Sequence, residues 1–369
     1  MRIATLQFAP KLGDVEGNIR RANELLQNGH PSRGATPATG LDTLKPDILV
    51  LPELALTGYN FPSREAIAPY LEPAGQGPSA TWARETAKKH RCKVCVGYPE
   101  IEAASTERDQ ASSPGTCYNS LLVVDERGEV ILNYRKTFLY YTDETWAAEG
   151  DAARSFHTLT LGPPSSPSSK AVATSFGICM DINPYRFEAP FTAWEFAHRV
   201  LDSKTQLVVL SMAWLTLLSR EELDRLADRP DMDTFNYWIQ RFLPLVRKRM
   251  QHSVDVDGEG DEAGKQIIIV FANRAGEEAG EDGASPARYA GTSTILAIRQ
   301  RPAPQSRAAG AVSDGEGGED GSASDGPDAS AFDVKILCWE MMGAGSEGIC
   351  FADTTADPRM VFGLVKAGT

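Results

Sequence analysis

Runs of apolar residues alternate with amphipathic stretches through the first hundred residues. Residues 2–8, 47–51 and 93–98 form short, nearly continuous apolar runs, which are typical of strands covered on both faces. Between them, residues 18–27 and 79–90 repeat apolar positions at helical spacing, and a serine opens the second stretch as a candidate N-cap. This β-α-β-α-β order predicts an α/β sheet with helices packed on it.

The pattern continues toward the C-terminus. A hairpin is predicted from residues 118–124 and 130–135, because the turn sequence Asp125-Glu126-Arg127-Gly128 joins two apolar runs. Further strands are expected at 171–178, 206–212, 266–272, 292–298 and 334–339, and helices at 187–201 and 235–250.

Several segments interrupt this pattern and are predicted to be mobile insertions. They are rich in small, polar or acidic residues that cannot bury much surface, and lie near 29–43, 102–116, 163–169, 255–264 and 302–330. Because strands recur on both sides of each insertion, residues 1–369 are interpreted as a single domain, with two domains as the alternative.

Charge and targeting signals narrow the classes of protein. The 369 residues carry a net charge of −13, which disfavours nucleic-acid binding because phosphate contacts need clustered Lys and Arg. The opening MRIATLQFAP lacks the apolar core of a signal peptide, and no apolar run is long enough to span a bilayer. We therefore expect a cytoplasmic protein with reduced thiols and no membrane partner.

Two charged residues stand at the ends of predicted strands, where α/β folds usually build active sites. Glu53 directly follows the buried run ending at Leu51, and burial would raise its pKa toward the range of a general base. Lys136 closes the second strand of the hairpin and could stabilise an oxyanion. Taken singly, each is more often an ordinary solvated charge at a strand end.

Cys179 is the third candidate, on a strand-to-helix turn after Ile178. A thiol there resembles a nucleophile elbow, although a cysteine in an apolar strand is more often part of the core. Cys92 and Cys95 form a lone Cys-x-x-Cys pair without a second pair or a histidine cluster, which favours structural packing over metal binding.

Together, Glu, Lys and Cys in this order resemble the catalytic residues of the nitrilase superfamily of carbon–nitrogen hydrolases. The resemblance extends from Arg2 to about Thr294 and rests on RIATLQFAPKLGDVEGNI, LVLPELALTGY, YRKTFLY and GICMDINPYRFE. Within that superfamily, YYTDETWAAEG and GICMDINPYRFEAPF are similar to the fungal protein N-terminal asparagine/glutamine amidohydrolases. Many relatives that act on smaller substrates carry a histidine where this chain has Phe138.

The resemblance implies a four-layer α-β-β-α sandwich and a cysteine amidohydrolase without metal or cofactor. Cys179 would be the nucleophile, Glu53 the base, and Lys136 with the backbone N–H of Met180 the oxyanion site. Glu144 is expected to orient these groups, as a second glutamate does in many relatives.

The implied reaction converts N-terminal Asn and Gln of proteins or peptides to Asp and Glu and releases ammonia. Such a substrate carries a free α-ammonium, for which Asp181 and Glu149 are candidate acceptors because both lie near catalytic residues in sequence. The N-terminal segments of these substrates would be the partners, and a homodimer is possible. An ω-amidase or carbamoyl hydrolase acting on a free small amide, and an inactive nitrilase-fold binding protein, are the alternatives.

Overall fold

The computed structural model describes residues 1–29, 39–103, 115–162, 169–226, 228–251, 264–280, 286–302 and 332–363. Most residues of the five predicted insertions lie outside these ranges, so their mobility stays a prediction.

The first sheet has seven strands and is built mainly from the N-terminal part of the chain. Its order is β15-β1-β2-β4-β5-β6, with β3 paired to β4 beside this path. The strands are β1 (Arg2–Gln7), β2 (Ile48–Val50), β3 (Glu72–Pro73), β4 (Lys93–Glu102), β5 (Thr116–Val124), β6 (Val130–Arg135) and β15 (Gly348–Asp353). β1, β2 and β4 run parallel, whereas β5, β6 and β15 join antiparallel.

The second sheet also has seven strands, in the order β16-β14-β13-β10-β9-β8-β7. They are β7 (Phe156–Leu161), β8 (Lys170–Ile178), β9 (Leu207–Ser211), β10 (Lys265–Ala272), β13 (Thr294–Pro302), β14 (Phe332–Met341) and β16 (Met360–Gly363). β8, β9 and β10 are parallel neighbours in its middle. A separate two-stranded hairpin pairs β11 (Glu277–Glu278) with β12 (Ala287–Arg288).

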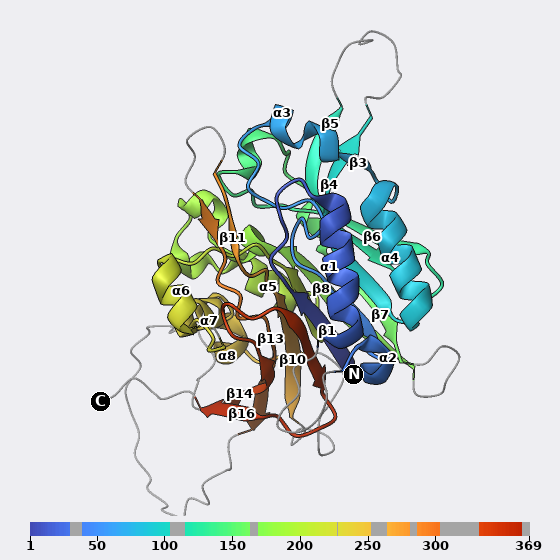
Figure 1. The fold of residues 1–369 in the computed structure, drawn as a ribbon. Coiled ribbons are helices and arrows are strands. Elements are labelled where there is room, and N and C mark those ends of the chain that lie inside the picture. Colours follow the sequence, from blue (N-terminus) through green and yellow to red (C-terminus); the bar gives the residue numbers. More distant parts are fainter. Residues whose placement is uncertain are drawn as a thin grey trace, which may run out of the picture.

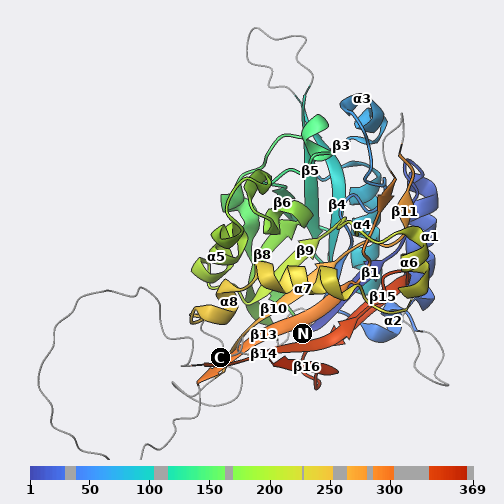
Figure 2. The same cartoon turned by 90° about the vertical axis from the view of Figure 1, so that its left-hand side faces the viewer.

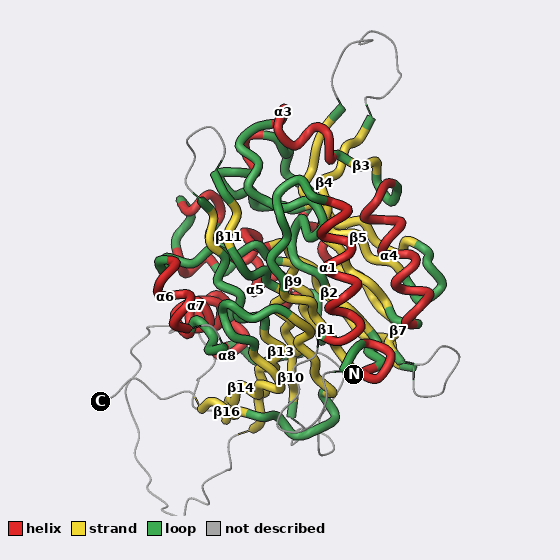
Figure 3. Tube along the Cα trace, viewed as in Figure 1, coloured by secondary structure: helices red, strands yellow, loops and turns green. Residues whose placement is uncertain are grey.

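Helices cover the outer faces of the two sheets, which face each other (Figures 1 and 2). The helices are α1 (Val15–Asn28), α2 (Leu41–Leu44), α3 (Arg64–Ile67), α4 (Gly77–His90), α5 (Glu195–Asp202), α6 (Arg220–Leu226), α7 (Met232–Arg241) and α8 (Pro244–Arg247). α1 and α4 lie on the first sheet, and α5, α7 and α8 on the second; Figure 3 separates the strands of the two inner layers from these helices. The expected four-layer α-β-β-α sandwich is confirmed.

Strand β2 shows why its run of apolar residues is continuous. Ile48 and Val50 point into the core between the sheets, whereas Leu49 and Leu51 point into the core beneath α1 and α4. Because side chains alternate across a strand, a strand covered on both faces needs apolar residues at every position.

Some predicted elements were wrong in their bounds. The helix expected at 187–201 begins only at Glu195, because Pro190 and a left-handed Trp194 precede it. The helix expected at 235–250 is two helices, since α7 ends at Arg241 and α8 starts at Pro244. Ser79 is not an N-cap but lies inside the first turn of α4, where its N–H and hydroxyl donate to Glu72.

Candidate active site

The ends of the central strands of both sheets meet at one edge of the sandwich. The Ser211 hydroxyl, at the end of β9, donates to the Leu51 carbonyl after β2 at 2.9 Å. Two residues on, the Glu53 N–H donates to the Met212 carbonyl at 3.3 Å. Gly97 lets the segment that carries Glu53 pass close to β4, because a Cβ at that position would lie 2.8 Å from the Glu53 Cα.

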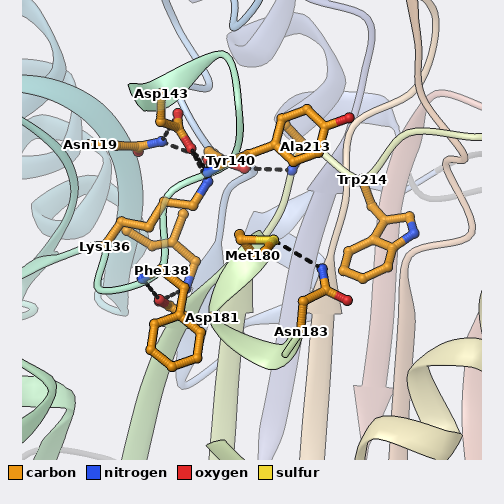
Figure 4. A network of polar contacts seen from close by, with 12 residues as sticks. Asn119, Lys136, Phe138, Tyr140, Asp143, Met180, Asp181, Asn183, Ala213 and Trp214 are labelled. Carbon is orange, nitrogen blue, oxygen red and sulfur yellow. Dashed lines mark hydrogen bonds and ion pairs between the residues drawn. The ribbon is translucent and has the colours of Figure 1, made fainter. Parts of the chain in front are cut away.

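A buried cluster of charged groups occupies this edge (Figure 4). Lys136 Nζ donates to Glu53 Oε1 and to Asp143 Oδ2, each at 2.6 Å. Asn119 Nδ2, on β5, donates to the same two carboxylates, at 2.6 Å to Glu53 and 3.0 Å to Asp143. The remaining oxygen of Glu53 accepts the Ala213 N–H at 2.9 Å. All three charged side chains are fully buried, so each charge depends on the others for compensation.

The environment of the cluster determines the protonation states of Glu53, Lys136 and the Cys179 thiol. Burial raises the pKa of Glu53, and Asp143 adds to this effect while Lys136 opposes it. Burial alone would lower the pKa of Lys136, but Asp143 and Glu53 raise it above its usual value and keep the ammonium charged. Burial and the charge of Glu53 raise the pKa of Cys179, so its resting form is the thiol and a base must remove the proton.

Cys179 stands at the sharp turn that follows β8. Its backbone has a φ of +38°, in the left-handed region that costs a residue other than glycine about 1–2 kcal/mol. Its side chain lines the same cavity as Ala213, and the residue is 9% exposed. The strained turn therefore presents the sulfur to a reachable space beside Glu53 and Lys136.

Asp181 ties the Cys179 turn to the segment that follows Lys136. Its carboxylate accepts the N–H groups of Thr137 and Phe138 at 2.9 and 2.8 Å, and the N–H of Ile178 at 2.8 Å. The hydroxyls of Thr137 and Tyr134 donate to it as well, each at 2.7 Å. With five donors and no exposed surface, Asp181 is placed to fix the two segments together rather than to meet a substrate ammonium, contrary to the expectation from sequence.

The acidic residue beside Lys136 also differs from the expected one. Asp143, in a 3-10 turn from Asp143 to Thr145, contacts Lys136 and accepts the Tyr140 N–H at 3.0 Å. Glu144 is the next residue and is exposed, so the carboxylate that contacts Lys136 is that of Asp143 and not that of the predicted Glu144. Glu149 is partly exposed and accepts the Tyr185 hydroxyl at 2.8 Å.

A cavity of about 490 Å³ opens over the thiol. Cys179, Met180, Tyr59 and Ala213 line its inner end. Its outer wall contains Asn183, Phe187, Trp214, Leu215, Thr216, Leu217, Leu218, Asp231, Asp233, Thr234 and Tyr237. The space is mainly apolar and aromatic with two carboxylates at one side, which suits an organic ligand that carries a positive group.

The two carboxylates, Asp231 and Asp233, differ in how exposed they are. Asp231 is buried and caps α7, accepting the Asp233 and Thr234 N–H groups and the hydroxyls of Thr216 and Thr234. Asp233 is exposed in the first turn of the same helix. Neither stood out in the sequence, since acidic residues at a helix start usually only cap it.

Among the residues that the structure describes, no group of three or more His, Cys, Asp or Glu side chains is placed to hold a metal ion. Cys92 and Cys95 are buried free thiols. None of the helices in the described ranges has the length and apolarity to cross a bilayer.

Comparison with known proteins identifies a family for these residues. The model of the carbon–nitrogen hydrolase family matches residues 2–183, which include Glu53, Lys136, Asp143 and Cys179. A protein N-terminal amidase of Schizosaccharomyces pombe is 32% identical over 313 residues, covering 81% of this chain and 92% of that protein. A protein N-terminal amidase of Saccharomyces cerevisiae is 35% identical over 310 residues. This match covers 67% of this chain and 64% of the yeast protein.

Solved structures agree on the fold. A crystal structure of an N-terminal amidase with a Gln-Gly peptide superimposes with a TM-score of 0.64 at 24% identity, covering 95% of this chain and 96% of that one. A nitrilase-superfamily amidase from Nesterenkonia gives a TM-score of 0.53 at 15% identity, covering 96% of this chain and 91% of that one. At these identities the likeness establishes the architecture.

Proposed function

The chain belongs to the carbon–nitrogen hydrolase family, and we propose that it deamidates N-terminal Asn and Gln of proteins or peptides to Asp and Glu. The observation that carries the chemistry is the buried contact of Lys136 with Glu53 beside a cavity lined by Cys179. The substrate is inferred from the two N-terminal amidases, which match most of this chain at 32% and 35% identity.

In the proposed reaction the Cys179 thiol gives its proton to Glu53, and the sulfur attacks the side-chain amide carbon. Lys136 and the Met180 N–H stabilise the oxyanion that develops on the amide oxygen. The C–N bond breaks as Glu53 returns the proton to nitrogen. Ammonia departs, and the acyl group stays on Cys179 as a thioester. Glu53 then deprotonates a water that hydrolyses the thioester, which restores the thiol and yields the carboxylate. Asp143 holds Lys136 in place throughout.

The α-ammonium of an N-terminal residue needs an acceptor a few ångströms from the reacting amide. Asp233 lines the cavity and is exposed, whereas the oxygens of Asp231 already accept several hydrogen bonds within the chain. We therefore assign the ammonium to Asp233, in place of Asp181 and Glu149.

The rest of the peptide must leave through the mouth of the cavity. Leu217 is fully exposed there, and Phe187 is half-exposed and packs against Tyr141. Exposed apolar side chains at an entrance suit an extended ligand better than a small amide.

Ammonia release tests this function. The substrates are a short peptide beginning with Asn, its Nα-acetylated form, free asparagine and a simple aliphatic amide, and Cys179→Ala is the control. We expect release from the free-amine peptide alone, abolished in the variant. Turnover of free asparagine or of the aliphatic amide at comparable efficiency would assign the chain to small-molecule amides instead.

Three expectations from the sequence stay predictions: a single domain, a homodimer and a cytoplasmic location. The first is supported by β15, near the C-terminus, which pairs with β1 along six residues from Arg2–Asp353 to Gln7–Gly348.

A further inference from the structure

The hairpin of β11 and β12 lies outside both main sheets and forms hydrogen bonds to Tyr59 and Thr216, two residues that line the active-site cavity. β11 ends in Glu278, which is 3% exposed, although its neighbour Glu277 is exposed and pairs with Arg288 at 2.9 Å. A buried carboxylate that takes no part in the proposed chemistry needs a structural explanation, because burying its charge is costly.

Glu278 holds the loop that carries Tyr59. Its carboxylate accepts the Tyr59 N–H at 3.1 Å and the Asn60 N–H at 2.9 Å. The Tyr289 hydroxyl and Arg274 Nη2 donate to it as well, each at 2.6 Å. In the described part of the chain, the other two guanidinium nitrogens of Arg274 have no hydrogen-bond partner, so Glu278 compensates this buried charge.

The residues that follow β12 pair with the Trp214–Thr216 segment, which lines the cavity. The Thr216 N–H donates to the Arg288 carbonyl, and the Ala290 N–H to the Trp214 carbonyl, each at 2.9 Å. Leu215 and Tyr289 form an antiparallel bridge between these bonds. One short segment thus contacts both the Tyr59 side and the Trp214–Thr216 side of the cavity.

Tyr59 in turn covers the catalytic cluster. Lys136 Nζ lies 5.7 Å from the centre of its ring, and Tyr59 is buried while lining the cavity beside Cys179. A displaced Tyr59 would admit water to the cluster, and water weakens the interactions among its charges.

We propose that Glu278 is a positioning residue that fixes Tyr59 over Lys136, and that the β11–β12 hairpin thereby sets the spacing between the Tyr59 side and the Trp214–Thr216 side of the active-site cavity. This inference rests on the proposed function, because its readout is turnover of a peptide that begins with Asn. It predicts that replacing Glu278 lowers kcat, although Glu278 does not contact the substrate.

The proposal also predicts in which direction the pH profile of kcat shifts when Tyr59 is displaced. The charged and polar groups that face Glu53 are Lys136, Asp143, Cys179, Asn119, Tyr59 and Tyr289. Burial is the largest cause that raises the pKa of Glu53. Water admitted past Tyr59 relieves that burial, so the pKa falls and the acidic limb of kcat moves to lower pH.

The test compares Glu278→Gln with the matched control Glu277→Gln, one residue earlier in the same strand. Steady-state kinetics across pH on an Asn peptide are measured for both, after wild-type turnover has established the proposed function. We expect Glu278→Gln to lower kcat about tenfold, with KM changed less than about threefold and the acidic limb shifted to lower pH. Glu277→Gln should behave as wild type.

Glu278→Gln leaves Arg274 without compensation and can fail to fold. Tyr289→Phe removes one hydrogen bond to Glu278 and keeps the charge pair, so it is expected to give a smaller change of kcat and of the acidic limb in the same direction. Wild-type kcat and an unmoved limb in either folded variant would overturn the proposal, even if the unfolding temperature drops. An inactive wild type would count against the proposed function instead.

Discussion

The two walls of the active-site cavity are built by different rules. The catalytic wall consists of Cys179, which lines the cavity, and of the fully buried Glu53, Lys136 and Asp143 beside it; all but Asp143 follow strand ends. The outer wall, which includes Phe187, Trp214, Leu217, Asp231 and Asp233, comes from loops and from the start of α7, and several of its side chains are exposed.

The family model separates the same two walls. It matches residues 2–183, which contain every residue of the catalytic wall but, of the residues named for the outer wall, only Asn183 at its last position. The N-terminal amidase of S. pombe, in contrast, matches over 81% of the chain. Family membership thus accounts for the type of reaction, whereas under the proposed function the choice of amide depends on residues beyond the part that the family model matches.

Removing a member of the catalytic wall should have the largest effect. Cys179→Ala removes the nucleophile and is expected to lower kcat on an Asn peptide by on the order of 10⁴-fold or more, with the fold intact. Glu53→Gln should approach this loss, because the thiol then has no base. Ammonia release and circular dichroism check both, and substantial turnover by folded Cys179→Ala would contradict the assignment.

Asp143→Asn and Glu144→Gln form a matched pair at adjacent positions. Asp143→Asn removes one of the two carboxylates at Lys136, and we expect kcat to fall about 10²-fold. Because the Asp143 charge raises the pKa of Glu53, its loss lowers that pKa and shifts the acidic limb of the residual activity to lower pH. Glu144→Gln, at an exposed position, should leave kcat and the pH profile unchanged.

A loss of kcat in Glu144→Gln while Asp143→Asn keeps wild-type kcat would instead assign the orienting position to Glu144, as expected from the resemblance.

Asp181→Asn should lower stability and kcat rather than raise KM. Asparagine places an amide group where five donors now converge, which costs about 3 kcal/mol and loosens the Cys179 turn. Thermal unfolding and kinetics on peptides measure the two effects. A rise in KM at unchanged stability would instead support an ammonium contact at Asp181.

Changes in the outer wall should be smallest and confined to substrate binding. Asp233→Asn is expected to raise KM for free-amine peptides about fivefold at similar kcat, because an exposed ion pair contributes little. Leu217→Ser should raise KM about threefold for peptides and not for a small amide. Asp202→Asn, an exposed carboxylate outside the cavity lining, is the control. A loss of kcat in Asp233→Asn without a change in KM would contradict this division between the walls.

Three of the four residues of the catalytic wall could be predicted from the sequence, because Glu53, Lys136 and Cys179 each follow an apolar strand. β2, β6 and β8 are recognisable runs, and the residues after them are Glu53, Lys136 and Cys179. The sequence could not predict whether Asp143 or Glu144 contacts Lys136. The two acids are adjacent in an irregular turn, and only the conformation of the turn decides which one points inward.

The outer wall could not be predicted for a different reason. Asp233 lies at a helix start where a cap is the simpler interpretation, and Leu217 lies in a loop with no period. Glu278 is similar, because it acts on Tyr59 across 219 residues and only the tertiary fold brings the two together. The strands β7, β15 and β16 were missed as well, because short edge strands carry a weak alternating pattern.

The central claim is that Cys179 forms a thioester with the side-chain acyl group of an N-terminal Asn or Gln. Intact-mass spectrometry of the wild-type protein, acid-quenched during turnover of an Asn peptide, tests it directly. The account predicts an adduct with the mass of the peptide less one ammonia, mapped to Cys179 and absent from Cys179→Ala. An adduct on another residue, or turnover that persists in Cys179→Ala, would contradict it.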